Sequence, residues 1–148
     1  MAREIVTKEN LDINARDREG RTALYWACHN SLSHVALEIL ERDDADVNAR
    51  DSEGRTALYF ACGNGLIDVA LRILERYIVD VNASDSEGWT ALFWACRNSL
   101  SDVALEILRR DNLDVTATDT NGRTALDVAR QQECFEIVRY LEEYPERQ

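Results

Sequence analysis

The sequence is poor in the features that would place a protein in a membrane or outside the cell. No apolar run in its 148 residues approaches the roughly 20 residues that a membrane-spanning helix needs. The first ten residues, MAREIVTKEN, lack the apolar segment of a secretion signal. We therefore expect no membrane partner and an intracellular, reducing location, the cytoplasm.

Motifs that carry chemistry are also scarce. The chain has no P-loop, no G-x-S-x-G and no H-E-x-x-H motif, and its only histidines are His29 and His34. It has no C-x-x-C pair of the kind that begins many zinc sites. The sequence therefore predicts a protein that is not an enzyme and that uses no cofactor and no metal.

Basic side chains are fewer than acidic ones. The chain has 28 acidic and 17 basic side chains, which gives a formal net charge of −11. Proteins that bind nucleic acid present a basic face, so we expect no nucleic-acid partner. The 45% apolar content is that of a folded domain and not of a disordered acidic tail.

One phrase recurs at a fixed interval of 34 residues. TALYWACHN begins at Thr22, TALYFACGN at Thr56, TALFWACRN at Thr90, and a looser copy, TALDVARQQ, at Thr124. Such a period indicates one structural unit that was copied and that packs on its neighbours. The units divide the chain into residues 1–11, a remnant of a preceding repeat or an N-terminal cap; repeats 12–45, 46–79 and 80–113; and a C-terminal capping repeat, 114–148, all in one continuous solenoid domain.

Each unit contains a turn and two helices. In the second unit, Asp51–Gly54 has the composition of a turn, and Thr56 is placed to cap a short helix that follows it. Asn64 and Gly65 end that helix, and apolar spacing predicts a second helix from about Ile67 to Arg76.

The combination of D-x-x-G-x-T-A-L, an N-G or N-S break, a V-A-L-x-I-L helix and D-V-N-A resembles the ankyrin repeat, from about Leu11 onward. The resemblance implies an all-α fold: an ankyrin-repeat solenoid of stacked helix-turn-helix units with β-hairpin or turn fingers. The usual T-P-L-H reads T-A-L-Y, T-A-L-F or T-A-L-D here. We expect the polar bond of that histidine between repeats to be lost, with an aromatic ring stacked in its place.

Two further departures concern spacing and turns. The family's glycine after the second helix is replaced by Asp44, Ile78 and Asn112, and isoleucine disfavours a left-handed cap, so the turn at Ile78 should differ. Equivalent threonines and leucines lie 18 residues apart in three repeats but 17 apart from Thr124 to Leu141. This predicts one extra residue between the helices of the first three repeats.

The last repeat differs from its sisters as a terminal cap should. Residues 114–148 replace aromatic and small residues by polar ones, as a terminal cap requires, and their second helix should end near Pro145.

Three of the cysteines, Cys28, Cys62 and Cys96, occupy one equivalent position in successive repeats. Packed helices lie about 8–10 Å apart, farther than a disulfide spans, so we expect small buried thiols.

The leading functional hypothesis is a non-catalytic module that binds a partner protein, as a monomer, through its concave face and fingertips. The two histidines cannot be catalytic features of the repeat, because sister repeats lack them. Family resemblance implies contact positions beside the turn glycine and at the end of the first helix. These positions are Arg18, Glu19, Arg21, His29, Asn30, Ser52, Glu53, Arg55, Asn64, Ser86, Glu87, Trp89, Arg97, Asn98, Thr120, Asn121 and Arg123.

Trp89 is the best single candidate for a binding hot spot. Its sister positions hold Arg21, Arg55 and Arg123, so the fold does not demand a tryptophan there. Tryptophan is among the residues that dominate measured interface energies. A local alternative stays open, in which Trp89 stacks on Arg55 or Arg123 of an adjacent finger.

Two other interpretations of the whole chain also stay open. The near-identity of the copies and the abrupt start favour an engineered or consensus ankyrin scaffold without a dedicated partner. The same start fits a regulatory repeat array excised from a larger multidomain protein.

Overall fold

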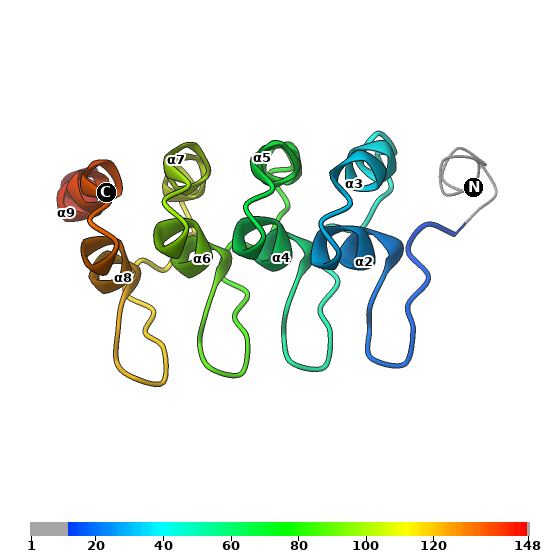
Figure 1. The fold of residues 1–148 in the computed structure, drawn as a ribbon, viewed down its shortest axis with the longest axis horizontal. Coiled ribbons are helices and arrows are strands. Elements are labelled where there is room, and N and C mark those ends of the chain that lie inside the picture. Colours follow the sequence, from blue (N-terminus) through cyan, green and yellow to red (C-terminus); the bar gives the residue numbers. More distant parts are fainter. Residues whose placement is uncertain (1–11, 148) are drawn as a thin grey trace.

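The computed structural model describes residues 12–147 (Figure 1). The predicted repeat remnant or cap at residues 1–11 lies outside the described residues. The described chain forms four helix pairs, one in each predicted repeat. The first helices are α2 (Ala23–His29), α4 (Ala57–Gly63), α6 (Ala91–Arg97) and α8 (Ala125–Gln131). The second helices are α3 (Ser33–Leu40), α5 (Ile67–Leu74), α7 (Ser101–Leu108) and α9 (Phe135–Arg147).

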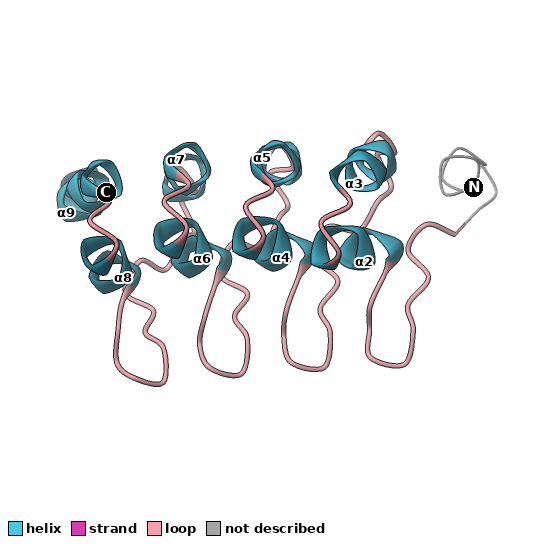
Figure 2. Cartoon of the chain, in the orientation of Figure 1, coloured by secondary structure: helices cyan, strands magenta, loops and turns pink. Residues whose placement is uncertain are grey.

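The helices stack in two parallel layers. The first helices contact one another in the order α2, α4, α6 and α8, and the second helices in the order α3, α5, α7 and α9. A long loop joins each pair to the next, and these loops project as fingers on the side of the first helices (Figure 2). The predicted all-α solenoid of stacked helix-turn-helix units is confirmed.

Threonine starts each first helix. The hydroxyl of Thr56 accepts a hydrogen bond from the backbone N–H of Tyr59 at 3.2 Å, and Thr22, Thr90 and Thr124 make the same bond. This bond satisfies one of the N–H groups that the first helical turn leaves without a partner. The predicted capping role of Thr56 is confirmed.

The break between the helices has the same length in all four repeats. Three residues separate α8 from α9, as in the other pairs, and Phe135 begins α9 exactly one period after Ser101 begins α7. The predicted extra residue between the helices of the first three repeats is therefore wrong. Leu141 lies one period after the buried Ile107, so its counterpart is Ile107 and not Leu108.

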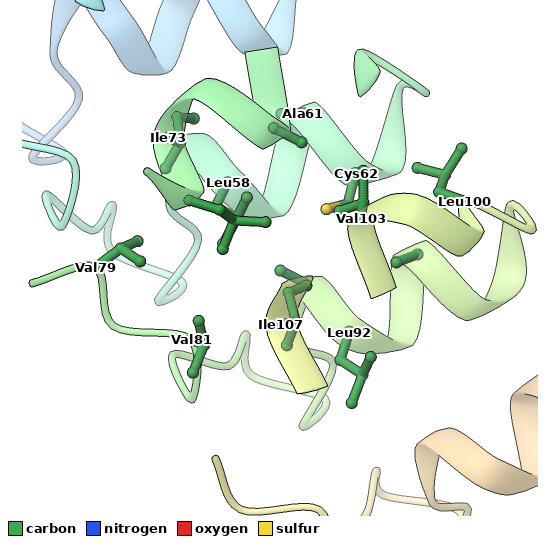
Figure 3. Packing of buried hydrophobic residues seen from close by; sticks show 14 of the residues in the cluster. Leu58, Ala61, Cys62, Ile73, Val79, Val81, Leu92, Leu100, Val103 and Ile107 are labelled. Carbon is green, nitrogen blue, oxygen red and sulfur yellow. The ribbon is translucent and has the colours of Figure 1, made fainter. Parts of the chain in front are cut away.

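The core lies between the two layers and continues from repeat to repeat (Figure 3). Ala61 and Cys62 of α4 and Val103 and Ile107 of α7 are all 0% exposed. The small side chains let neighbouring first helices approach closely, and the branched side chains of the second helices fill the remaining volume. The core is thus shared between neighbours, as a repeat architecture requires.

The three equivalent cysteines are buried free thiols. Cys28, Cys62 and Cys96 are each 0% exposed. Burial raises the pKa of Cys28 and Cys96 to about 12 and also raises that of Cys62. The prediction that they are small buried residues is confirmed, and at neutral pH the thiols stay protonated and unreactive.

Turn glycines let each finger contact the next one. Gly54 has φ 87°, and a Cβ atom there would lie 2.4 Å from the carbonyl oxygen of Ser84 in the following finger. Gly20 and Gly88 are packed in the same way. Within residues 12–147 the fingers carry no strand, only an isolated bridge between Ser84 and Thr90, so they take the turn form.

Arginine closes the C-terminal ends of α3 and α5. The guanidinium of Arg76 donates to the carbonyl oxygens of Leu40 at 2.8 Å and Arg42 at 2.9 Å in the preceding repeat. Arg110 makes the equivalent bonds to the carbonyl oxygens of Leu74 and Arg76. An arginine from the next repeat therefore satisfies the last carbonyls of α3 and of α5, which a glycine cap would otherwise do.

The prediction that the turn at Ile78 should differ is wrong: Ala45, Val79 and Leu113 donate equivalent backbone bonds to the carbonyls of Arg42, Arg76 and Arg110. Among the described non-glycine residues, positive φ occurs at Ser31, Ser99 and Glu133, and not at Ile78. The helix α5 ends at Leu74, two residues before the predicted end. At the C-terminal end, α9 runs to Arg147, two residues beyond Pro145, near which its end was predicted.

Candidate partner-binding surface

An aspartate at the base of each finger organises the loop. In the second finger, Oδ1 of Asp51 accepts hydrogen bonds from the backbone N–H groups of Glu53 and Arg55, both at 2.9 Å. Its Oδ2 accepts from Nε of Arg55 at 2.8 Å. Asp17, Asp85 and Asp119 hold the equivalent backbone groups. The base of each finger is therefore fixed before any partner arrives.

The same aspartate connects its finger to the preceding repeat. The hydroxyl of Tyr25 donates to Oδ2 of Asp51 at 2.6 Å, and the hydroxyl of Tyr59 donates to Oδ2 of Asp85 at the same distance. The expectation that the aromatic residue only stacks, with loss of the polar bond between repeats, is therefore wrong at both tyrosines. The phenol hydroxyl reaches the next finger and replaces the missing histidine.

These bonds shift the acidity of both partners. Burial raises the pKa of the Asp51 carboxyl, but hydrogen bonds from Tyr25 and from Arg55 outweigh burial and bring the pKa below its ordinary value. Burial also raises the pKa of Tyr25 and Tyr59, and their bonds to the aspartates raise it further. The charged carboxylate and the neutral phenol are thus the stable pair at neutral pH.

The third repeat makes this connection with a different residue. Phe93 has no hydroxyl, and the indole Nε1 of Trp89 donates to Oδ2 of Asp119 at 3.1 Å instead. The Trp89 ring lies 5.5 Å from the Phe93 ring, and the guanidinium carbon of Arg123 lies 5.6 Å from its centre. Trp89 is half-buried, so it does not leave its whole apolar surface in water. This geometry matches the local stacking alternative, and a contact between Trp89 and a partner stays a prediction.

A row of aromatic rings runs along the first helices beside the fingers. Trp26 is 37% exposed, and Phe60 and Trp94 at the sister positions are half-buried. The guanidinium of Arg21 lies 4.5 Å from the centre of the Trp26 ring, and that of Arg55 lies 5.3 Å from Phe60. Each ring is therefore held between its helix and the base of its own finger.

The sequence analysis did not select these three rings. The signal was present, because Trp26, Phe60 and Trp94 share one repeat position, which lies outside the helix face formed by Leu24 and Cys28. Phe60 and Trp94 pack against the edge of the core, and all three rings leave part of their surface accessible. This row of rings indicates a surface available for contact.

The predicted contact residues lie mostly at the surface. Arg21, Arg55, Trp89 and Arg123 are half-buried at the finger bases. The exposed ones are Arg18, Glu19, His29, Asn30, Ser52, Glu53, Asn64, Ser86, Glu87, Arg97, Asn98, Thr120 and Asn121. We call the finger segments from tip to base (18–21, 52–55, 86–89 and 120–123) together with Trp26, Phe60 and Trp94 the finger-side surface.

Two predicted contact residues have a clear structural role. The side-chain amide of Asn64 donates to the carbonyl oxygens of Cys28 at 2.8 Å and His29 at 3.1 Å, which end the preceding first helix. The amide of Asn98 makes the same bonds to Cys62 and Gly63. These bonds account for both asparagines without a partner.

A groove lies between the second and third fingers. It has a volume of about 570 Å³ and is lined by residues 50–54 and 84–86. Arg50 crosses its base, donating from Nε to the carbonyl of Gly54 at 3.1 Å and from Nη2 to the carbonyl of Ser84 at 2.9 Å. The rest of the lining consists of the acidic residues Asp51, Glu53 and Asp85 together with Ser52, Gly54, Ser84 and Ser86.

The described residues contain no group of three or more histidine, cysteine or acidic side chains placed to hold a metal ion. In the same part of the chain, no helix combines the length and the apolarity needed to cross a bilayer.

Comparison with known proteins identifies the family. A family model described as ankyrin repeats in three copies matches residues 1–85 and, overlapping them, residues 70–147. A search of curated proteins finds no match. The repeat period, the capping threonines, the turn glycines and this match agree. The chain belongs to the ankyrin-repeat family, whose members are generally protein–protein interaction modules and are typically not catalytic.

Proposed function

We propose that this chain is a non-catalytic module that binds one partner protein across its concave face, the finger-side surface. The observation that carries the proposal is the row of Trp26, Phe60 and Trp94. Three rings occupy successive outward positions, each fixed under a finger-base side chain. Aromatic rings give large contact area at a small cost in conformational entropy, particularly where they are already ordered.

The fingertips supply the variable part of this surface. Equivalent tip positions hold Arg18, Ser52, Ser86 and Thr120, whereas the aspartate, the glycine and the threonine around them repeat. The tip side chains of Ser52 and Ser86 are exposed and form no hydrogen bond within residues 12–147. The constant residues therefore hold the finger, while the tips are free to differ and to select a partner. The net charge of −11 favours a protein partner over nucleic acid.

The experiment compares the wild type with the double variant Ser52→Arg, Ser86→Arg. Arg18 already occupies the equivalent tip, so the fold accommodates arginine there, and thermal unfolding should be unchanged. A partner captured by the wild type from a cell extract is purified, and its affinity for both proteins is measured by calorimetry.

The proposal expects the double variant to bind the purified partner at least about tenfold more weakly. Phe60→Ala should weaken the same complex by removing one ring of the row. If both variants bind the partner as tightly as the wild type does, the partner must contact a different surface. Failure of the wild type to capture any protein would favour a scaffold without a dedicated partner.

A further inference from the structure

The turn after α5 exposes two adjacent apolar side chains. Tyr77 is 88% exposed and Ile78 is 61% exposed, and neither is part of the apolar cluster that fills the core. The two sister turns hold Asp43–Asp44 and Asp111–Asn112 at the same positions. The fold therefore forms this turn with polar residues, and nothing in its packing requires tyrosine and isoleucine.

The turn that carries them is rigidly held. The backbone N–H of Val79 donates to the carbonyl of Arg76 at 3.1 Å, so Tyr77 and Ile78 are the two central residues of a hydrogen-bonded turn. Below it, the Arg76 side chain binds backbone carbonyls of the preceding repeat. The amide of Asn48 donates to the carbonyl of Ile78 at 2.9 Å. The apolar pair is thus presented on an ordered backbone, which lowers the entropic cost of docking.

The surroundings of the pair are acidic. Asp43 and Asp111 in the neighbouring turns and Asp80 in the following segment are exposed, and none forms an ion pair within the described residues. The nearby cations are already used, because Arg76 and Arg110 turn inward to backbone carbonyls. An apolar centre with an acidic rim complements a surface of the opposite charge and disfavours a second copy of the same turn.

We propose that Tyr77 and Ile78 are the centre of a second docking surface, which binds a cationic segment of another protein with apolar side chains between its lysines or arginines. This surface lies on the turns that follow the second helices and shares no residue with the finger-side surface, so it does not depend on the proposed function. The tyrosine and isoleucine contact the apolar side chains of the segment, and Asp43, Asp80 and Asp111 pair with its cations.

The probe is a synthetic amphipathic helical peptide of leucine and lysine, titrated by calorimetry into the whole chain at low and at physiological salt. The matched variant is Tyr77→Asp, Ile78→Asn, which copies the third repeat's turn. The variant carries one more negative charge than the wild type. Attraction by charge alone would therefore make it bind the peptide at least as tightly.

The proposal expects the opposite: the variant binds at least about tenfold more weakly, with an unchanged melting temperature. Asp111→Tyr with Asn112→Ile, added to that variant, should restore binding one repeat further along. Ser52→Arg with Ser86→Arg should leave peptide binding unchanged, which separates this surface from the fingers.

Three results would overturn the proposal. One is peptide binding to the Tyr77→Asp, Ile78→Asn variant as tight as to the wild type. Another is equal binding of a leucine and glutamate peptide of the same pattern, since the acidic rim should repel it. The third is a wild-type dimer in sedimentation velocity that the variant loses, because this would assign the pair to contact between two copies of the chain.

Discussion

The exchange of residues in the third repeat gives the sharpest test of how the repeats are joined. The side chain of Asp119 is 1% exposed and receives its bond from the preceding repeat through Trp89, because Phe93 has no hydroxyl. Trp89→Arg would give this repeat the finger base of its sisters but would remove that bond. A hydrogen bond to a charged group contributes about 1.5–3 kcal/mol, and a new, partly exposed ion pair with Asp85 returns about 0–1 kcal/mol. We expect a net loss of about 0.5–3 kcal/mol in the free energy of unfolding.

Adding Phe93→Tyr should reverse this loss. The double variant has the arginine and tyrosine of the first two repeats, in which Tyr25 and Tyr59 bind the next aspartate at 2.6 Å. Phe93→Tyr alone directs a hydroxyl at an oxygen already occupied by the indole, and such crowding costs about 1–3 kcal/mol. Both single variants are therefore expected to be less stable than the double variant.

The assay is urea unfolding of the wild type, both single variants and the double variant, followed by circular dichroism. A coupling energy above about 1 kcal/mol between the two positions is expected for residues that share one partner. Simple addition of the two single effects would refute the reasoning that Trp89 replaces the tyrosine hydroxyl. The double variant also gives the cleanest test of Trp89 as a hot spot, because it removes the tryptophan while keeping the connection to Asp119.

Three further predictions concern the cap, the carboxylate and the repeat unit. Thr56→Ala should lower the free energy of unfolding by about 0.5–2 kcal/mol, and an unchanged urea midpoint would show that the hydroxyl is not a cap. The lowered pKa of Asp51 stabilises the fold above the ordinary carboxyl pKa, and this contribution is lost as the pH falls through the lowered value. Tyr25→Phe removes one of the hydrogen bonds that lower this pKa. The difference in urea midpoint between the wild type and Tyr25→Phe should therefore narrow from pH 7 to pH 3, and a constant difference would contradict this. Deletion of residues 46–79 should leave a shorter cooperative solenoid, because Asp85 would take the place of Asp51 as partner of Tyr25; loss of the helical circular dichroism signal would argue for one indivisible core.

The sequence predicts what one repeat does by itself. The period placed the helix pairs, Thr56 was identified as a cap, and Gly54 as a turn residue, because each role depends on neighbours a few positions away. The structure departs from prediction where a side chain acts on another repeat. Arg110 closes α5, which ends 36 residues earlier, and this is why the turn at Ile78 needs no left-handed residue.

Differences between sister positions do not by themselves show whether the fold needs a residue. Trp89 differs from its sisters, and in the sequence this difference suggests a residue that the fold does not need. In the structure Trp89 makes the bond to the next finger's aspartate, Asp119, that Tyr25 and Tyr59 make in the first two repeats and that Phe93 cannot make. The row of Trp26, Phe60 and Trp94 could have been predicted from its outward spacing, whereas the pairing across repeats required the geometry.

The most direct test of the central claim is an amide hydrogen-exchange footprint of the chain with its purified partner. Binding through the finger-side surface predicts slower exchange at residues 18–21, 52–55, 86–89 and 120–123 and in the first helices. The outer second helices, such as α3 and α5, should exchange at the same rate in the free and the bound protein. Slowed exchange confined to the second helices, with the fingers unchanged, would contradict the account.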